Sequence, residues 1–183
     1  MTWPVRATRL VYENPWIRVR EDAVTRPDGS DGIFGVVEVQ RPAVFVVAWT
    51  DEDEIVLITV DRHTVGPSVE VPAGGTDGED PLVAARRELA EETGLVAGEW
   101  RQVGTMNALN GVCRAPEVVF LATGLEPAPG TGNDPAAAHE EGIRDVRRVP
   151  VADVLTLVAD GTITDGETIA ALMFALVARG RVT

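Results

Sequence analysis

The sequence predicts an α/β protein, either of the α+β type or a mixed α/β/α sandwich. Three observations predict it. Strand-like apolar segments precede a helical segment at residues 82–93, further strand-like segments follow it, and two helical segments end the sequence. Strands that flank a helix and are followed by terminal helices fit packed layers of sheet and helix. The 183 residues suffice for one domain with a sizeable core and a small appendage.

The N-terminal region is predicted to be β structure. Residues 16–20 alternate apolar and polar side chains, a cluster of turn residues covers 26–32, and 33–39 is strand-like again. A hairpin of this kind is either an additional sheet or a dimer contact, and composition leaves both open. We place a boundary between this β region, residues 1–40, and a domain at residues 41–183.

The next segments lead to a glycine-rich loop. Residues 43–49 form a continuous apolar run, which is typical of a strand buried on both faces. The acidic turn at 50–54 and a second strand at 55–60 predict a hairpin with it. A loop at 61–67 and a short strand at 68–71 follow.

The rest of the sequence predicts alternating strands and loops and then two helices. A stripe of apolar residues at helical spacing on the last helix is expected to pack into the core. That stripe comprises Ile169, Leu172, Met173, Leu176 and Val177. The predicted elements are strands at 100–106, 118–122 and 142–149, loops at 107–116 and 127–138, and helices at 151–159 and 167–178.

The centre of the sequence combines a glycine-rich loop with a helix. Pro72 to Gly78 is a turn-rich loop. Asp80 is a favourable N-cap and Pro81 suits the first helical position. Gly94 is the expected left-handed stop after a helix rich in Ala, Leu, Arg and Glu.

Three carboxylates project from one face of that helix. Glu88, Glu91 and Glu92 stand at i, i+3 and i+4, so their side chains are neighbours. Adjacent carboxylates raise one another's pKa unless positive charge lies among them. Mg²⁺ or Mn²⁺ would supply that charge, because both prefer oxygen ligands. The alternative is a solvated acidic face, which the bare pattern favours when taken alone.

The loop and helix together resemble the signature of the Nudix hydrolases, G-x5-E-x7-R-E-U-x-E-E-x-G-U, where U is aliphatic. From Glu79 to Leu95 every fixed position of the signature is matched. One position departs from it: the residue six places before Glu79 is Ala73, and Gly74 is one place too close. The loop is therefore one residue short, and whether Ala73 or Gly74 presents a carbonyl to a metal stays open.

Further segments are similar to the ADP-ribose pyrophosphatase branch of the family. They are residues 12–16, 26–30 and 36–38, and Glu70 to Gly74, which matches the branch pattern E-x-P-A-G. The resemblance implies an α/β/α sandwich with a mixed sheet and an N-terminal β hairpin. It also implies a homodimer with shared sites and the hydrolysis of ADP-ribose to AMP and ribose 5-phosphate.

The same resemblance implies a set of metal ligands and a cofactor. The expected ligands are Glu88, Glu91, Glu92, Glu141 and the carbonyl of Ala73, and the expected ion is Mg²⁺, with Mn²⁺ as an alternative. Two or more ions could be held, with Glu91 shared between them.

The catalytic residues implied are Glu91, Glu140 and Glu141. In this branch an acidic loop before a late strand supplies a metal ligand and a base for water. We assign Glu141 as the ligand and Glu140 as the base, and the two assignments could be exchanged. His139 is a rival base because the unperturbed pKa of histidine suits proton transfer near neutral pH.

The implied substrate-binding residues are Arg62, Glu117 and Gly74. Arg62 falls where the branch has the arginine of a Q-Y-R motif, although the two residues before it differ; the alternative is a surface ion pair. Glu117 resembles the acid after the second substrate loop, or it is a solvated charge at a strand end. Arg87 is expected to point away from the carboxylates and to pair with Glu79.

Charge and composition exclude several classes of partner. The net charge of −13 argues against binding to nucleic acid and to anionic membranes. No apolar run has the length of a membrane span. The single cysteine, Cys113, and the absence of a signal-like start suit the cytoplasm.

Three alternatives to ADP-ribose hydrolysis remain open from the sequence. The first is a Nudix hydrolase of another sugar nucleotide, a dinucleotide or a nucleoside triphosphate. The second is a non-catalytic module that senses a nucleotide, although a sensor has no need of all three carboxylates. The third is a structural protein stabilised by calcium.

Overall fold

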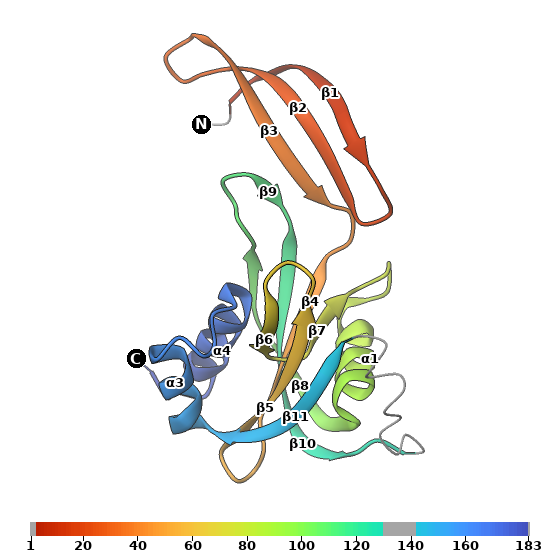
Figure 1. Cartoon of the computed structure of the whole chain (residues 1–183), viewed down its shortest axis with the longest axis vertical. Helices are drawn as coiled ribbons and strands as arrows, with labels where there is room; N and C mark the ends of the chain where they lie inside the picture. Colours follow the sequence, from red (N-terminus) through yellow and green to blue (C-terminus); the bar gives the residue numbers. More distant parts are fainter. Residues whose placement is uncertain (1–2, 130–141, 183) are drawn as a thin grey trace.

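A computed structural model describes residues 3–129 and 142–182 of the chain, and strands make up most of it. The strands are β1 (Val5–Glu13), β2 (Ile17–Thr25), β3 (Asp31–Val39), β4 (Ala43–Ala48), β5 (Glu54–Arg62), β6 (Gly66–Glu70), β7 (Ala73–Gly75), β8 (Leu95–Asn107), β9 (Cys113–Arg114), β10 (Pro116–Pro127) and β11 (Ile143–Pro150). The helices are α1 (Pro81–Thr93), α3 (Val151–Ala159) and α4 (Gly166–Ala178). The strands form three sheets, and helices flank the body that contains two of them, with α1 on one side and α3 and α4 on the other (Figure 1).

The central sheet is mixed. Its strand order is β7-β4-β10-β8, with β4 parallel to β10 and the other pairs antiparallel. A second sheet has the order β11-β5-β6. The predicted hairpin of residues 43–49 and 55–60 is present only at its turn. Trp49 and Ile55 form an antiparallel bridge, and the N–H of Thr50 donates a hydrogen bond of 2.9 Å to the carbonyl of Glu54, but the two strands belong to different sheets. Strand β4 pairs with β10 and β7, whereas β5 pairs with the distant β11 and with β6, which follows it in the chain.

Both faces of β4 are buried, which explains its continuous apolar run. Alternate side chains of a strand point to opposite faces, so the run divides into two sets. One set packs against α1 and consists of Val44, Val46 and Ala48 with Ala85 and Leu89. The other set packs against α4 and consists of Phe45, Val47 and Trp49 with Leu172 and Leu176. Because helices cover both faces, the predicted α/β/α sandwich is confirmed.

Helix α1 begins and ends where the sequence predicts. The side chain of Asp80 accepts a hydrogen bond from the backbone N–H of Leu82, and Pro81 occupies the first helical position. Gly94 ends the helix with a φ of 67°, a left-handed conformation that glycine adopts without strain. Strand β8 then starts directly at Leu95, earlier than the predicted strand at 100–106.

The N-terminal region forms a separate sheet with the order β1-β2-β3-β9. The predicted hairpin is present as β2 and β3, and β1 adds an antiparallel strand that the sequence analysis did not predict. The short strand β9 comes from the predicted loop at 107–116 and pairs in parallel with β3. Figure 1 shows this sheet projecting from the helix-covered body.

The apolar stripe predicted for the last helix is only partly in the core. Leu172 and Leu176 are buried, whereas Met173 and Val177 are exposed. The face of α4 that is buried includes Ala171 and Ala175 in their place. Small residues let the helix axis approach the sheet closely, and this decides which face is covered. In the described part of the chain, no helix has the length and apolar character needed to cross a membrane.

Candidate active site

The loop before α1 is tied to the helix by Arg87. Its guanidinium donates hydrogen bonds to Glu79 at 3.1 Å, Glu88 at 2.8 Å, Glu91 at 3.0 Å and the carbonyl of Gly75 at 3.0 Å. Burial lowers the pKa of Arg87, but these carboxylates outweigh it and raise the pKa above its usual value. The predicted pair with Glu79 is confirmed. The prediction that Arg87 points away from the carboxylates is wrong, because its long side chain reaches back among them.

Glu88 and Glu92 are buried against the backbone of the same loop. Oε2 of Glu92 accepts a hydrogen bond of 2.8 Å from the backbone N–H of Ala73. The carboxylate of Glu88 lies over the α-carbon of Gly74, where an added β-carbon would be only 2.2 Å from Oε1. A side chain at this position would force the carboxylate of Glu88 to move, so glycine allows the carboxylate to stay in this place.

The donor chemistry of this helix face suits a hard divalent cation, since all the side-chain donors are carboxylate oxygens. Among the described residues, however, no three His, Cys, Asp or Glu side chains already converge as a metal cluster would. Arg87 now contributes the positive charge between Glu88 and Glu91. The carboxylates are therefore suitable ligands for a cation. In this structure, however, Glu88 and Glu91 contact the guanidinium of Arg87 and do not converge on one point as metal ligands would.

A cavity of about 600 Å³ adjoins the loop. It brings together the three predicted substrate-binding residues, which span more than 50 positions of the sequence. Its lining includes Arg62, Ala73, Gly74 and Glu117. Apolar side chains and the exposed indole of Trp16, 72% accessible, complete part of the wall. Its size suits a small-molecule ligand.

Arg62 reaches this cavity as one half of an ion pair. Its Nε and Nη2 donate to the two oxygens of Glu70 at 3.1 and 2.5 Å. This bidentate bond raises the pKa of Arg62. Glu70 is buried, so the pair fixes the guanidinium at the cavity wall more firmly than two exposed charges would.

Glu117 is the most perturbed acid of the cavity. Only 6% of the residue is exposed, and its Oε2 has no hydrogen-bond partner in the described part of the chain. Burial, followed by the charges of Glu167 and Asp165, raises the pKa of Glu117 to about 7. The prediction of a solvated strand-end charge therefore does not describe this residue.

Two of these acids were not singled out as site residues from the sequence. Glu167 is only the first residue of the predicted helix at 167–178, and Asp165 precedes that helix. Both line the cavity at the N-terminus of α4. The sequence signal was an acidic residue in the first helical turn, which ordinarily indicates capping, so nothing local connected them with Glu117.

The predicted ligand and base residues of the late acidic loop, Glu140 and Glu141 with the rival His139, lie outside the described residues.

The sequence matches two known families, and the matches cover the sandwich, the glycine-rich loop and helix α1 with its three glutamates. Residues 39–172 match the NUDIX domain, and residues 3–37 match the nucleoside diphosphate sugar hydrolase N-terminal domain. The chain therefore belongs to the Nudix family, as a Nudix pyrophosphohydrolase. The resemblance found in the sequence is confirmed.

The chain is also similar to individual proteins of known name and to a solved structure. The chain is 35% identical over 158 residues to an ADP-ribose pyrophosphatase of Mycobacterium tuberculosis, covering 85% of this chain and 74% of that protein. It is 31% identical over 170 residues to an ADP-ribose pyrophosphatase of Bacillus subtilis, covering 92% and 89%. A solved ADP compounds hydrolase superposes with a TM-score of 0.82 at 22% identity, covering 100% of this chain and 98% of the other, which supports the fold.

Proposed function

We propose that this protein hydrolyses the pyrophosphate bond of a nucleoside diphosphate sugar, with ADP-ribose as substrate and AMP and ribose 5-phosphate as products. The observation that carries the proposal is the position of the signature loop. Gly74, against which Glu88 packs, also lines the cavity that holds Arg62 and Glu117. The names of the relatives from Mycobacterium tuberculosis and Bacillus subtilis support ADP-ribose.

The reaction is proposed to depend on Mg²⁺ or Mn²⁺ held by Glu88, Glu91, Glu92, Glu141 and the carbonyl of Ala73. When bound, the cation would offset the charge that develops on the phosphoryl oxygens. Glu88 and Glu92 are buried and fixed against the loop, so these residues are suited to hold their oxygens in place. Arg87 would keep its bonds to Glu79 and Gly75 and so maintain the loop.

The other roles follow from side-chain chemistry. Arg62, held by Glu70, is proposed to bind a phosphate or ribose oxygen through its remaining guanidinium hydrogens. Glu117 is proposed to contact the substrate through a carboxyl oxygen. The base that takes the proton from water is proposed to be Glu140, with Glu141 or His139 as the alternatives.

A cytoplasmic location is proposed because the lone Cys113 excludes an intrachain disulfide; cell fractionation tests it.

The experiment measures AMP release from ADP-ribose with and without Mg²⁺, beside other sugar nucleotides, dinucleotides and nucleoside triphosphates. We expect Mg²⁺-dependent turnover that is fastest with ADP-ribose. We expect Glu92→Gln to reduce turnover to background with an unchanged circular dichroism spectrum, and Glu52→Gln, in an exposed turn, to be unaffected. Absence of turnover with every compound in the presence of metal would refute the proposal.

A further inference from the structure

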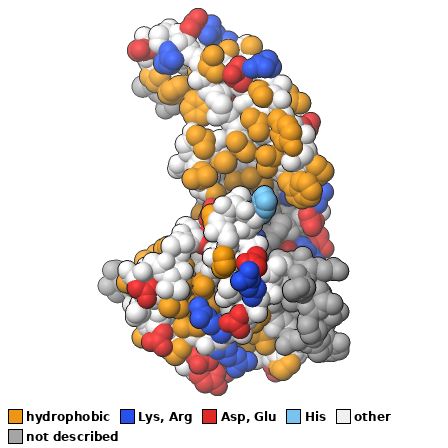
Figure 2. Space-filling view, in the orientation of Figure 1, with side chains coloured by type: hydrophobic (Ala, Val, Ile, Leu, Met, Phe, Trp, Pro, Cys, Tyr) orange, Lys and Arg blue, Asp and Glu red, His pale blue; other side chains and the backbone are white. Residues whose placement is uncertain are grey.

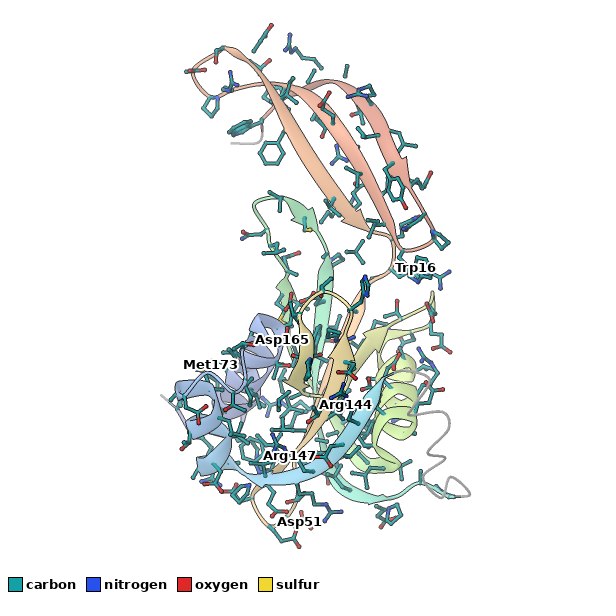
Figure 3. The ribbon with its side chains drawn as sticks, in the orientation of Figure 1. Trp16, Asp51, Arg144, Arg147, Asp165 and Met173 are labelled. Carbon is teal, nitrogen blue, oxygen red and sulfur yellow. The ribbon has the colours of Figure 1, made fainter. Side chains whose placement is uncertain are left out.

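One wall of the cavity carries three carboxylates that the proposed mechanism leaves largely unused. Glu117 lies on β10, while Asp165 and Glu167 lie at the N-terminus of α4. Figure 3 shows Asp165 at the start of this helix. The first turn is fixed to the body because the hydroxyl of Thr168 accepts a hydrogen bond of 3.2 Å from the backbone N–H of Val71.

Helix capping explains only part of this wall. Oδ2 of Asp165 accepts a hydrogen bond of 2.7 Å from the N–H of Thr168, and an acid in the first turn, such as Glu167, favours the helix dipole. Capping gives no reason for Glu117, which is buried with an unpartnered oxygen. A buried polar atom without a partner costs free energy, so such an atom at a cavity indicates a ligand that supplies the missing hydrogen-bond partner.

The charges of the wall are crowded and incompletely neutralised. Burial and a hydrogen bond with Asp165 raise the pKa of Glu167, and burial with the charges of Glu167 and Asp165 raises that of Glu117. The nearby cation, Arg62, donates hydrogen bonds to both oxygens of Glu70. Its interaction with Asp165 is a charge–charge interaction only. The wall therefore offers hydrogen-bond acceptors together with negative potential.

We propose that Glu117, Asp165 and Glu167 form a subsite for a neutral, hydroxyl-rich group of the substrate, and that Glu167 determines selectivity against an anionic group there. Carboxylates accept hydrogen bonds from sugar hydroxyls, and each such bond is strengthened by the charge. A phosphate in the same place would be repelled by the same oxygens. The inference rests on the proposed function, because it assigns this wall to the sugar portion of a nucleoside diphosphate sugar.

The test compares ADP-ribose with ADP-ribose 1″-phosphate, which differs by one phosphate on the terminal ribose. Both kcat/KM and metal-free binding by calorimetry are measured for the wild type, Glu167→Gln and Glu167→Lys. Asp153→Asn is the matched control because Asp153 is also a first-turn acid, on α3, and is exposed away from the cavity. Thermal unfolding of each variant separates a loss of helix stability from a change of selectivity.

We expect the wild type and Asp153→Asn to prefer ADP-ribose by roughly tenfold or more, as like-charge repulsion predicts. Glu167→Gln should reduce this preference, and Glu167→Lys should abolish or reverse it. A preference that is unchanged in a folded Glu167→Lys, or that is absent from the wild type, would overturn the subsite. A binding preference that depends on Glu167, without any turnover by the wild type, would support the subsite and contradict only the proposed hydrolysis.

Discussion

Single residues decide where the signature carboxylates stand. Gly74 leaves room for the carboxylate of Glu88, and the N–H of Ala73 holds Glu92. Arg87 joins Glu88 and Glu91 to the loop. These contacts fix the direction of each carboxylate, which matters because misplacing a reacting group by about 1 Å can cost on the order of 100-fold in rate.

The substitution Gly74→Ala tests the packing of Glu88 directly. The new methyl group would lie 2.2 Å from Oε1, so the carboxylate must move. We expect turnover to fall on the order of 100-fold and the Mg²⁺ concentration for half-maximal activity to rise. The matched control is Gly75→Ala, whose β-carbon would meet nothing closer than 3.7 Å. Equal activity of the two variants would contradict the role given to this contact.

The pH dependence of stability tests Glu117. Its folded pKa of about 7 lies above the ordinary value of 4.5, so the folded protein binds more protons than the unfolded chain between these values. The free energy of unfolding should therefore fall as the pH rises through this window. Glu117→Gln removes the ionisation, so its stability relative to the wild type should increase with pH.

We expect the relative gain of Glu117→Gln between pH 5 and pH 8 to be on the order of 2 kcal/mol, reduced to the extent that the cavity hydrates the carboxylate. Urea unfolding at several pH values measures it. Glu126→Gln, an exposed acid on the same strand, should show no comparable trend. Parallel pH profiles for Glu117→Gln and the wild type would show that the carboxyl is not perturbed.

At the scale of elements, the approach of α4 to β8 holds the acidic wall in place. Gly104 on β8 faces the ring of Phe174 on α4, where an added β-carbon would lie 2.5 Å from the ring. The same helix carries Asp165 as its cap and Glu167 in its first turn. Helix position and cavity shape are therefore coupled through this contact.

The substitution Gly104→Ala should displace the ring and destabilise the fold by about 1 to 3 kcal/mol, a typical cost of overpacking. Thermal or urea unfolding measures the change. Gly98→Ala is the control on the same strand, because its β-carbon would have only ordinary contacts at 3.6 Å. A Gly104→Ala variant as stable as this control would mean that the ring moves without cost.

At the scale of the whole molecule, the N-terminal sheet leaves apolar side chains uncovered. All nine residues of β1 are exposed. Figure 2 shows hydrophobic side chains gathered over this part of the molecule. The exposed set includes Val5, Leu10, Val11, Tyr12, Trp16 and Ile33. Apolar side chains exposed in this number on one sheet indicate an interaction site, and a second copy of the chain is the occupant we propose.

The mass in solution tests this homodimer. We expect light scattering to give twice the chain mass for the wild type and a shift toward monomer for Leu10→Arg combined with Ile33→Arg. A charged residue in an apolar interface loses its hydration without a partner. Leu155→Arg, at an exposed apolar position on α3, is the control. A monomeric wild type would contradict the proposal, and so would a double variant that remains dimeric.

The region 1–40 and the domain 41–183 remain our proposed division of the chain.

The sequence by itself determined α1, both of its caps and the identity of the signature carboxylates. Capping and the i, i+3, i+4 spacing act within one or two turns, so their physical causes lie close together in the chain. Only the tertiary structure decided that β4 pairs with β10 instead of β5, and that Arg87 lies among the carboxylates. It also brought Glu117 beside Asp165 and Glu167. Those contacts depend on how the buried faces of different helices and strands pack together. Residue spacing within one segment does not indicate which distant segment it will pack against.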